Sequence, residues 1–126
     1  MNGEIHKAEA LIRWQHPEKG LVGPFEFIPI AEETKLIEDI GNWVFLEASR
    51  QSALWRASLQ SNFQISINTS PVQYQKDSFC AKAWLEHLNA LGLSGDAITI
   101  EITEGTLMES GTNIDQILLD FRDANI

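Results

Sequence analysis

Three short segments alternate apolar and polar side chains, and each carries one residue able to bind a metal ion. The segments are Ala8–Trp14, Gln64–Thr69 and Ala97–Glu104. Alternation with a period of two predicts β-strands, in which successive side chains point to opposite faces of the sheet. Glu9, Asn68 and Glu101 then lie on the face opposite the isoleucines. We therefore expect two carboxylates and one amide oxygen to converge there, which is a ligand set typical of a hard cation.

The composition indicates one modest globular domain. The chain has 126 residues, 44% of them hydrophobic, which is enough for a real core. Its formal net charge of −9 argues against binding to nucleic acid polymers or to anionic membranes, because like charges repel. A small anionic ligand, held by one arginine and metal ions, remains compatible with this charge.

Cysteine usage and hydropathy bear on the cellular location. Cys80 is the one cysteine, so no internal disulfide forms and a reducing compartment fits. No apolar stretch approaches the roughly 20 residues of a membrane span, and the polar N-terminal residues lack a signal-peptide pattern. We expect a cytoplasmic location, with any membrane tether supplied by other domains.

Helical patterns separate the three strands. We predict helices over Ile30–Thr34 and Leu36–Ala57, then one capped by Asp77 or Ser78 and ended by Gly92, and a last one capped by Thr112 or Asn113. The segment Gln15–Phe25, rich in Pro and Gly, is predicted to be a loop. Alternating strands and helices imply parallel pairing through right-handed crossovers. The fold class is therefore α/β, a partial TIM-type (β/α) barrel with three parallel βα units, since a complete barrel needs about 250 residues.

The aromatic and histidine residues give structural rather than functional signals. The four tryptophans are predicted to pack in the core or between helices; they are Trp14, Trp43, Trp55 and Trp84. His16, which precedes Pro17 in the predicted loop, is assigned a structural role.

An extended set of motifs runs along the chain in a recognisable order and spacing. The motifs are EALIRWQHPEKG at Glu9–Gly20, PFEFIPIAEET at Pro24–Thr34, GNWV at Gly41–Val44, INTSPVQY at Ile67–Tyr74, GLSGDAITIEITEGTLM at Gly92–Met108 and LLDFRDANI at Leu118–Ile126. Together they resemble the EAL domain, a bacterial cyclic-di-GMP phosphodiesterase module. The resemblance covers essentially the whole chain.

The resemblance implies a fold, a reaction and a set of site residues. Its fold is a modified TIM-type barrel, and its reaction is hydrolysis of one phosphodiester bond of cyclic-di-GMP to linear pGpG with two Mg²⁺ or Mn²⁺ ions. Carried over by position, Glu9, Asn68 and Glu101 resemble metal ligands. Arg13 resembles the residue that holds a substrate phosphate, and Leu11, beside the ligand on the same face, is assigned with it to substrate binding.

Departures from the family pattern point to a partial domain over residues 1–126. The family's first strand region and the C-terminal half of its barrel, with paired aspartates that complete the metal site, have no counterpart here. We therefore assign no complete catalytic set to this chain and expect it alone to be inactive. Exposed parallel strand edges favour self-association or strand exchange.

Two further interpretations remain open. The parent domain is either a catalytic phosphodiesterase or a non-catalytic receptor that binds cyclic-di-GMP and signals through partners, and an inactive fragment is compatible with both. Adjoining GGDEF or sensor domains are expected in such parents. Glu104, by strand parity, is assigned either a local structural role or a role in supporting the ligands from behind.

Overall fold

The computed structural model describes residues 7–59, 62–74, 81–102, 113–124 and 126. A parallel sheet with the order β1-β4-β5 lies at its centre, formed by β1 (Lys7–Ala10), β4 (Gln64–Asn68) and β5 (Ile98–Glu101). The predicted parallel α/β arrangement is confirmed. The strands are shorter than predicted, because β1 ends at Ala10 and β5 at Glu101; Glu104 lies outside the described residues.

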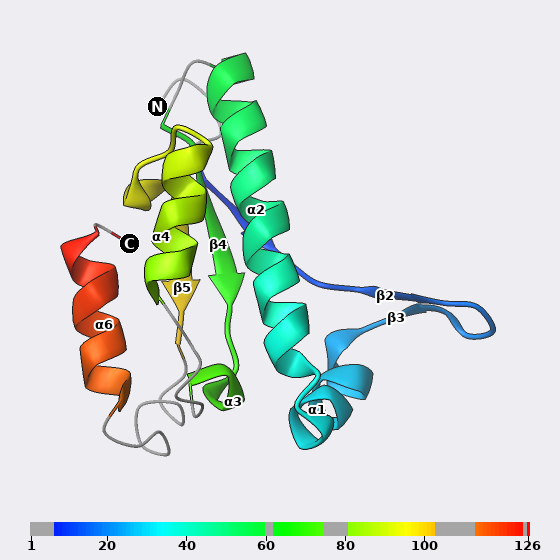
Figure 1. Ribbon diagram of the computed structural model, residues 1–126. Helices are drawn as coiled ribbons and strands as arrows, with labels where there is room; N and C mark the ends of the chain where they lie inside the picture. Colours follow the sequence, from blue (N-terminus) through cyan, green and yellow to red (C-terminus); the bar gives the residue numbers. More distant parts are fainter. Residues whose placement is uncertain (1–6, 60–61, 75–80, 103–112, 125) are drawn as a thin grey trace.

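A hairpin occupies part of the segment that was predicted to be a loop. Strands β2 (Trp14–His16) and β3 (Gly20–Val22) pair antiparallel and project away from the sheet (Figure 1). The His16 Nδ1 accepts hydrogen bonds from two backbone N–H groups of the turn, at 3.0 and 3.1 Å. Gly20 has a φ of 74°, which glycine adopts without steric cost. The structural role assigned to His16 is therefore confirmed.

Helices follow each strand of the parallel sheet. They are α1 (Pro24–Thr34), α2 (Ile37–Leu59), α3 (Pro71–Tyr74), α4 (Ala81–Ala90), the short 3₁₀ helix η1 (Gly95–Ala97) and α6 (Asn113–Asp123). Helix α1 begins earlier than predicted, because Pro24 rather than Pro29 stands at its start, where the missing N–H leaves no hydrogen bond unmade. The predicted caps Asp77 and Ser78 lie outside the described residues. No helix in the part that the structure describes is long and apolar enough to cross a membrane.

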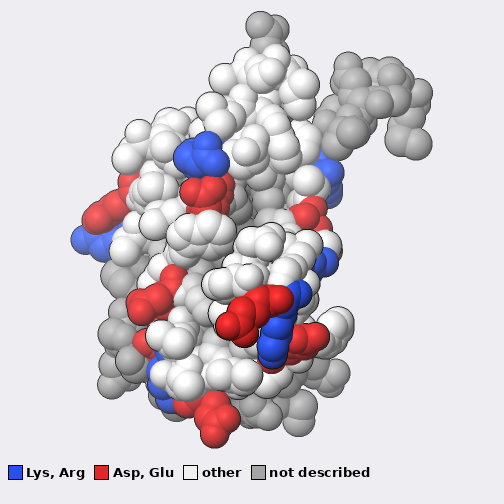
Figure 2. Space-filling model, turned by 90° about the vertical axis from the view of Figure 1, so that its right-hand side faces the viewer, with Lys and Arg blue, Asp and Glu red and all other residues white. Residues whose placement is uncertain are grey.

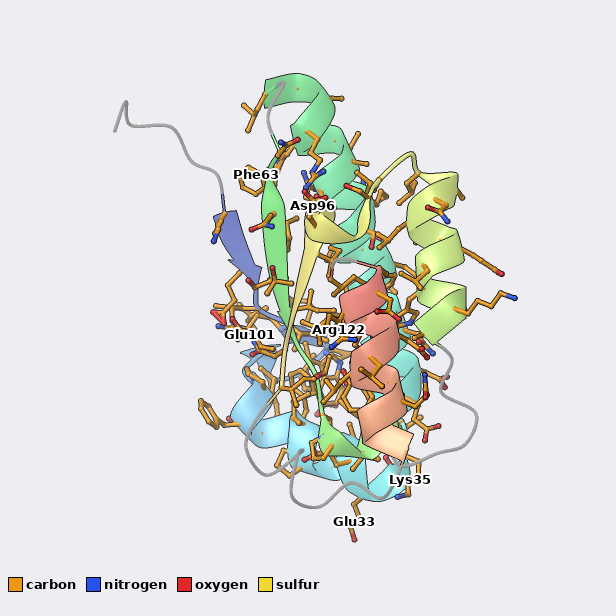
Figure 3. The ribbon with its side chains drawn as sticks, turned by 90° about the vertical axis from the view of Figure 1, so that its left-hand side faces the viewer. Glu33, Lys35, Phe63, Asp96, Glu101 and Arg122 are labelled. Carbon is orange, nitrogen blue, oxygen red and sulfur yellow. The ribbon has the colours of Figure 1, made fainter. Side chains whose placement is uncertain are left out.

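The hydrophobic core lies on one face of the sheet. Ile65, Ile67 and Ile98 are buried there, Ile100 packs against them partly buried, and helices α2, α4 and α6 cover this face (Figures 1 and 3). Phe45 of α2 and Trp84 of α4 stack with ring centroids 4.1 Å apart, and Phe121 of α6 packs beside Trp84. This arrangement leaves the polar face of the strands free of these helices.

Three of the four tryptophans are not core residues. Only Trp84 is buried, at 5% exposure, whereas Trp14, Trp43 and Trp55 are 46%, 56% and 36% exposed. As core residues these three were predicted wrongly. Trp43 and Trp55 lie on α2, where helical spacing alone cannot tell a covered face from one left open. Trp14 lies in β2 and contacts Phe27 of helix α1 edge-on. The exposed pair Trp43 and Trp55 lies on α2 beside β1, where both line a pocket of about 320 Å³.

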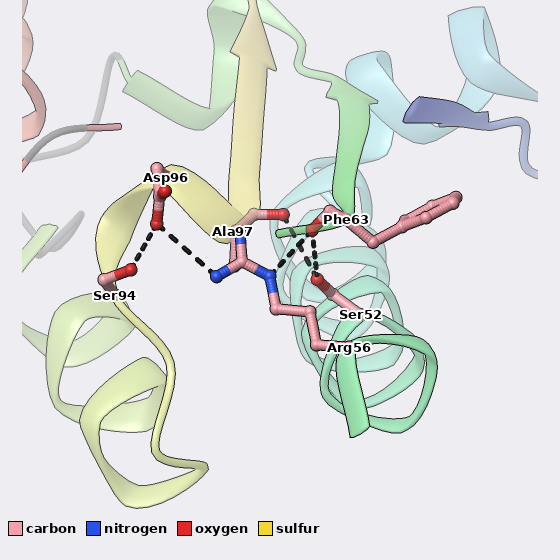
Figure 4. A network of polar contacts seen from close by, with 6 residues as sticks. All are labelled: Ser52, Arg56, Phe63, Ser94, Asp96 and Ala97. Atoms are coloured by element: carbon pink, nitrogen blue, oxygen red, sulfur yellow. Dashed lines mark hydrogen bonds and ion pairs between the residues drawn. The ribbon is translucent and has the colours of Figure 1, made fainter. Parts of the chain in front are cut away.

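A polar network joins the starts of β4 and β5 (Figure 4). The Ser52 hydroxyl donates to the carbonyl oxygens of Phe63 and Ala97, both at 3.3 Å. Arg56 donates from Nε to the Phe63 oxygen at 2.8 Å, and its Nη1 lies 3.5 Å from Asp96. Since Ser52 and Arg56 both belong to α2, this helix sets the spacing of the two strands at their N-terminal ends.

Candidate functional site

Glu9, Asn68 and Glu101 share the face of the sheet that the helices leave open. Exposure alternates along each strand, and these three residues fall on the exposed positions. Figure 3 shows Glu101 on the sheet side of the molecule, opposite the helices. The predicted common face is therefore confirmed, while the role of these residues as metal ligands stays a prediction.

Strand register brings the three side chains close together. Asn68 and Glu101 are direct partners in the β4–β5 pair, whereas Glu9 pairs with Ser66, one step nearer the strand starts. The Asn68 Nδ2 bridges that step, because it donates to the Glu9 Oε1 at 3.4 Å. Two carboxylates thus flank one amide near the C-terminal ends of three parallel strands.

The donor set fits a hard divalent cation. All three side chains offer oxygen atoms to an ion once the Asn68 amide turns so that Oδ1 faces Glu9. Mg²⁺ and Mn²⁺ prefer such ligands. Both carboxylates are exposed and accessible to a hydrated ion. The described residues contain no group of three or more His, Cys, Asp or Glu side chains that could together hold a metal ion. The candidate site has only two carboxylates because an amide takes the third position.

Leu11 and Arg13 follow directly after β1 and are both exposed. They line a pocket of about 330 Å³ that also contains Asn68 and Glu32. The Arg13 Nη1 donates to the Ile12 carbonyl at 2.7 Å, and no ion pair joins Arg13 to Glu9 within residues 7–59. The exposed guanidinium therefore lines this pocket without a carboxylate partner in that range.

Four polar residues that sequence reasoning did not assign to the site hold the end of β4. Thr69 donates from both its backbone N–H and its hydroxyl to the Glu101 carbonyl oxygen. The Ser70 hydroxyl lies 2.5 Å from Glu32 of α1, and its N–H donates to Gln73 Oε1 at 2.8 Å. The sequence signal of Thr69 and Ser70 is their position directly after a strand that carries a candidate ligand, where parallel sheets commonly place functional groups. Glu32 of α1 and Gln73 of α3 carry no such signal.

Tyr74 lies beneath this strand end and is 1% exposed. Burial raises its pKa to about 12, because the phenolate would lose its hydration, and the neighbouring Thr69 hydroxyl lowers the pKa by a smaller amount. The phenol therefore stays neutral over the working pH range. Tyr74 therefore contributes to the core and interacts, as a neutral phenol, with Thr69 at the end of β4.

A family model described as "EAL domain" matches residues 1–126. Among curated proteins, the oxygen sensor protein DosP of Escherichia coli is 38% identical over 124 residues, which are 98% of this chain and 15% of that protein. The cyclic di-GMP phosphodiesterase PdeR of Escherichia coli is 40% identical over 108 residues, 86% of this chain and 16% of its own length. The chain thus spans about one sixth of these relatives.

Solved structures give the same fold. The PaMucR phosphodiesterase in complex with c-di-GMP has a TM-score of 0.78 and 34% identity, over 93% of this chain and 46% of that one. The EAL enzyme Bd1971, in a form with cAMP and cyclic-di-GMP bound, has a TM-score of 0.83 and 29% identity. The match covers 98% of this chain and 34% of that one. These likenesses support the interpretation of the parallel sheet as part of a TIM-barrel-type domain.

Proposed function

Because the chain belongs to the EAL domain family, we propose that it carries one side of a metal-dependent site that hydrolyses cyclic-di-GMP to linear pGpG. Glu9, Asn68 and Glu101 are the proposed ligands of Mg²⁺ or Mn²⁺. Arg13 and Leu11 are the proposed contacts to the nucleotide. The activity of curated relatives named as cyclic di-GMP phosphodiesterases supports this assignment.

One observation carries the proposal: the Glu9–Asn68 contact of 3.4 Å beside the Asn68–Glu101 pair. Three oxygen donors on neighbouring strands satisfy one side of an octahedral ion and leave its other positions open to water and phosphate. Bound divalent ions stabilise charge on phosphate oxygens and lower the pKa of a coordinated water. Of the chain's own groups, Arg13 offers a planar fork of N–H donors that matches a phosphate.

We also propose that residues 1–126 form one portion of a larger barrel. The chain spans 46% of the solved PaMucR phosphodiesterase chain, and the ligands described here all come from one sheet edge. The remaining protein groups of a two-ion site would then come from elsewhere in a longer protein. GGDEF or sensor domains are proposed neighbours, since relatives include a bifunctional diguanylate cyclase/phosphodiesterase and an oxygen sensor.

Self-association through the β1 edge is part of the same proposal. Among the described strands β1 pairs only with β4, so its other edge is unpaired there. Residues of β1 also line the pocket that contains Trp43 and Trp55. Figure 2, viewed from the side toward which the hairpin projects, shows broad uncharged areas between scattered charged side chains. An open strand edge beside exposed aromatic residues favours pairing with a second chain.

Titration calorimetry with cyclic-di-GMP tests the proposal, first with Ca²⁺ to hold the nucleotide unhydrolysed and then with Mg²⁺ and chromatography for pGpG. Binding that Glu9→Gln weakens supports the site, and pGpG formation supports catalysis. Binding without pGpG indicates a receptor function for this chain. No binding at millimolar nucleotide would contradict a nucleotide site in these residues.

A further inference from the structure

Two donors of Thr69 converge on one acceptor, the carbonyl oxygen of Glu101. The backbone N–H lies 3.2 Å from this oxygen and the side-chain hydroxyl 3.0 Å from it. Thr69 is 9% exposed, so both bonds are largely shielded from water. Thr69 directly follows Asn68, and Glu101 is the last residue of β5.

The shared carbonyl controls the direction of the Glu101 side chain. Its oxygen belongs to the planar peptide unit between Glu101 and Ile102, so holding the oxygen fixes the ψ angle of Glu101. The Cα–Cβ direction of Glu101 is then set relative to the backbone of Thr69. Because Asn68 is the residue before Thr69, the two hydrogen bonds from Thr69 to the Glu101 carbonyl also set the distance between Asn68 and Glu101, the two proposed ligands.

Ser70, the residue after Thr69, is held by hydrogen bonds of its own. Ser70 is bonded through its hydroxyl to Glu32 of α1 at 2.5 Å and through its N–H to Gln73 at 2.8 Å. Gln73 is itself 5% exposed and packs against Gly41 of α2. The segment that carries Asn68 is therefore attached to two helices, and the Thr69 hydroxyl connects this rigid segment to the end of β5.

We propose that Thr69 is a positioning residue for the metal site, acting through its hydroxyl bond to the Glu101 carbonyl. The inference rests on the proposed function, since it concerns the same ligands. A residue that only stabilised the fold would lower the free energy of unfolding without changing ion affinity in the folded state. A positioning residue changes ion affinity in the folded state.

Three substitutions at Thr69 separate these roles. Thr69→Val replaces the hydroxyl by a methyl of similar shape. Thr69→Ala removes both the hydroxyl and the γ-methyl, so the side chain is smaller. Thr69→Ser keeps the hydroxyl. Mn²⁺ binding is measured by water-proton relaxation on the folded chain, with urea unfolding in parallel. We expect Val and Ala to weaken Mn²⁺ binding by about 10-fold, at the lower end of the effects of groups that orient metal ligands, and Ser to restore it.

Ser52→Ala is the matched control. The Ser52 hydroxyl also joins β4 to β5, through the carbonyls of Phe63 and Ala97, but at the opposite end of the strands. The Ser52→Ala substitution should lower the free energy of unfolding while leaving Mn²⁺ affinity unchanged. Equal affinity of Val, Ala and wild-type chains, or an equal loss in Ser52→Ala, would overturn the positioning role. A wild-type chain that binds no Mn²⁺ would instead overturn the proposed metal site itself.

Discussion

The Asn68 Nδ2 donates to the Glu9 Oε1 at 3.4 Å, although the two residues are 59 positions apart in the chain. The contact arises because parallel pairing places β1 beside β4 with Glu9 opposite Ser66, so that Asn68 stands one step farther along the same face. An amide and a carboxylate separated by nearly half the chain length thus meet where three strands end. Glu101 adds the second carboxylate from β5.

Gly41→Ala should destabilise the chain although alanine is the better helix former. A Cβ at this position would lie 1.9 Å from Nε2 of Gln73, and Gln73 cannot move without losing its bond to the Ser70 N–H. We expect a loss of about 1–3 kcal/mol in urea unfolding. Gly23→Ala is the control, since nothing lies within 4 Å of its Cβ. Equal stability of the two variants would contradict the close packing of α2 on Gln73.

The Ser52 hydroxyl should contribute to stability at the far end of the strands. It is fully buried and bridges two carbonyl oxygens, so Ser52→Ala should cost about 1–2 kcal/mol in chemical unfolding. Arg50→Ala on the same helix removes an exposed ion pair with Glu47, which water screens, and should leave stability nearly unchanged. A Ser52→Ala chain as stable as Arg50→Ala would refute the bridging role.

Ionisation of Tyr74 should unfold the chain at high pH. Its pKa is raised to about 12 in the folded state against an ordinary value of 10, because burial disfavours the phenolate. The folded state therefore binds the phenolic proton more tightly. This tighter proton binding contributes on the order of 2 kcal/mol to the free energy of unfolding. The contribution is present in full below pH 10 and is lost as pH rises from 10 to 12.

Absorbance at 295 nm reports this transition directly, because Tyr74 is the one tyrosine of the chain. We expect phenolate absorbance to rise well above pH 10 and to coincide with unfolding followed by circular dichroism. Tyr74→Phe should show no such absorbance change. Titration of the native chain near pH 10, without loss of structure, would show that the phenol is not buried.

Trp43→Gln should weaken association of the chain with itself. Trp43 is 56% exposed on the α2 face that borders the open edge of β1, so its replacement removes apolar area from the proposed contact. Light scattering across a concentration series should show a lower average mass than for wild type. Leu119→Gln, at a 40% exposed position on α6, is the control and should leave the mass unchanged. A monomeric wild-type chain would contradict association through this edge.

The strand pattern made the sheet and the common face of Glu9, Asn68 and Glu101 predictable, because a period of two determines which side chains share a face. The hairpin was missed since β2 and β3 have three residues each, too short for an alternation to show. The exposure of Trp43 depends on what covers α2, which local spacing does not encode.

The hydrogen bonds of Thr69 and Ser70 depend on strand register and on the approach of α1, which only the tertiary structure provides. In the sequence both residues look like ordinary polar residues before a proline. The motifs located the proposed ligands, whereas the groups that hold those ligands in place became visible in three dimensions.

The most direct test of the proposed metal site is the NMR signal loss caused by substoichiometric Mn²⁺ in the ¹⁵N-labelled chain. Paramagnetic broadening should centre on the Asn68 side-chain amide and on the backbone amides of Glu9 and Glu101. Glu101→Gln should weaken this effect about tenfold, equivalent to about 1.4 kcal/mol. Glu33→Gln, an exposed carboxylate on α1, should leave it unchanged. Broadening centred on other carboxylates, or equal effects of the two substitutions, would contradict the site.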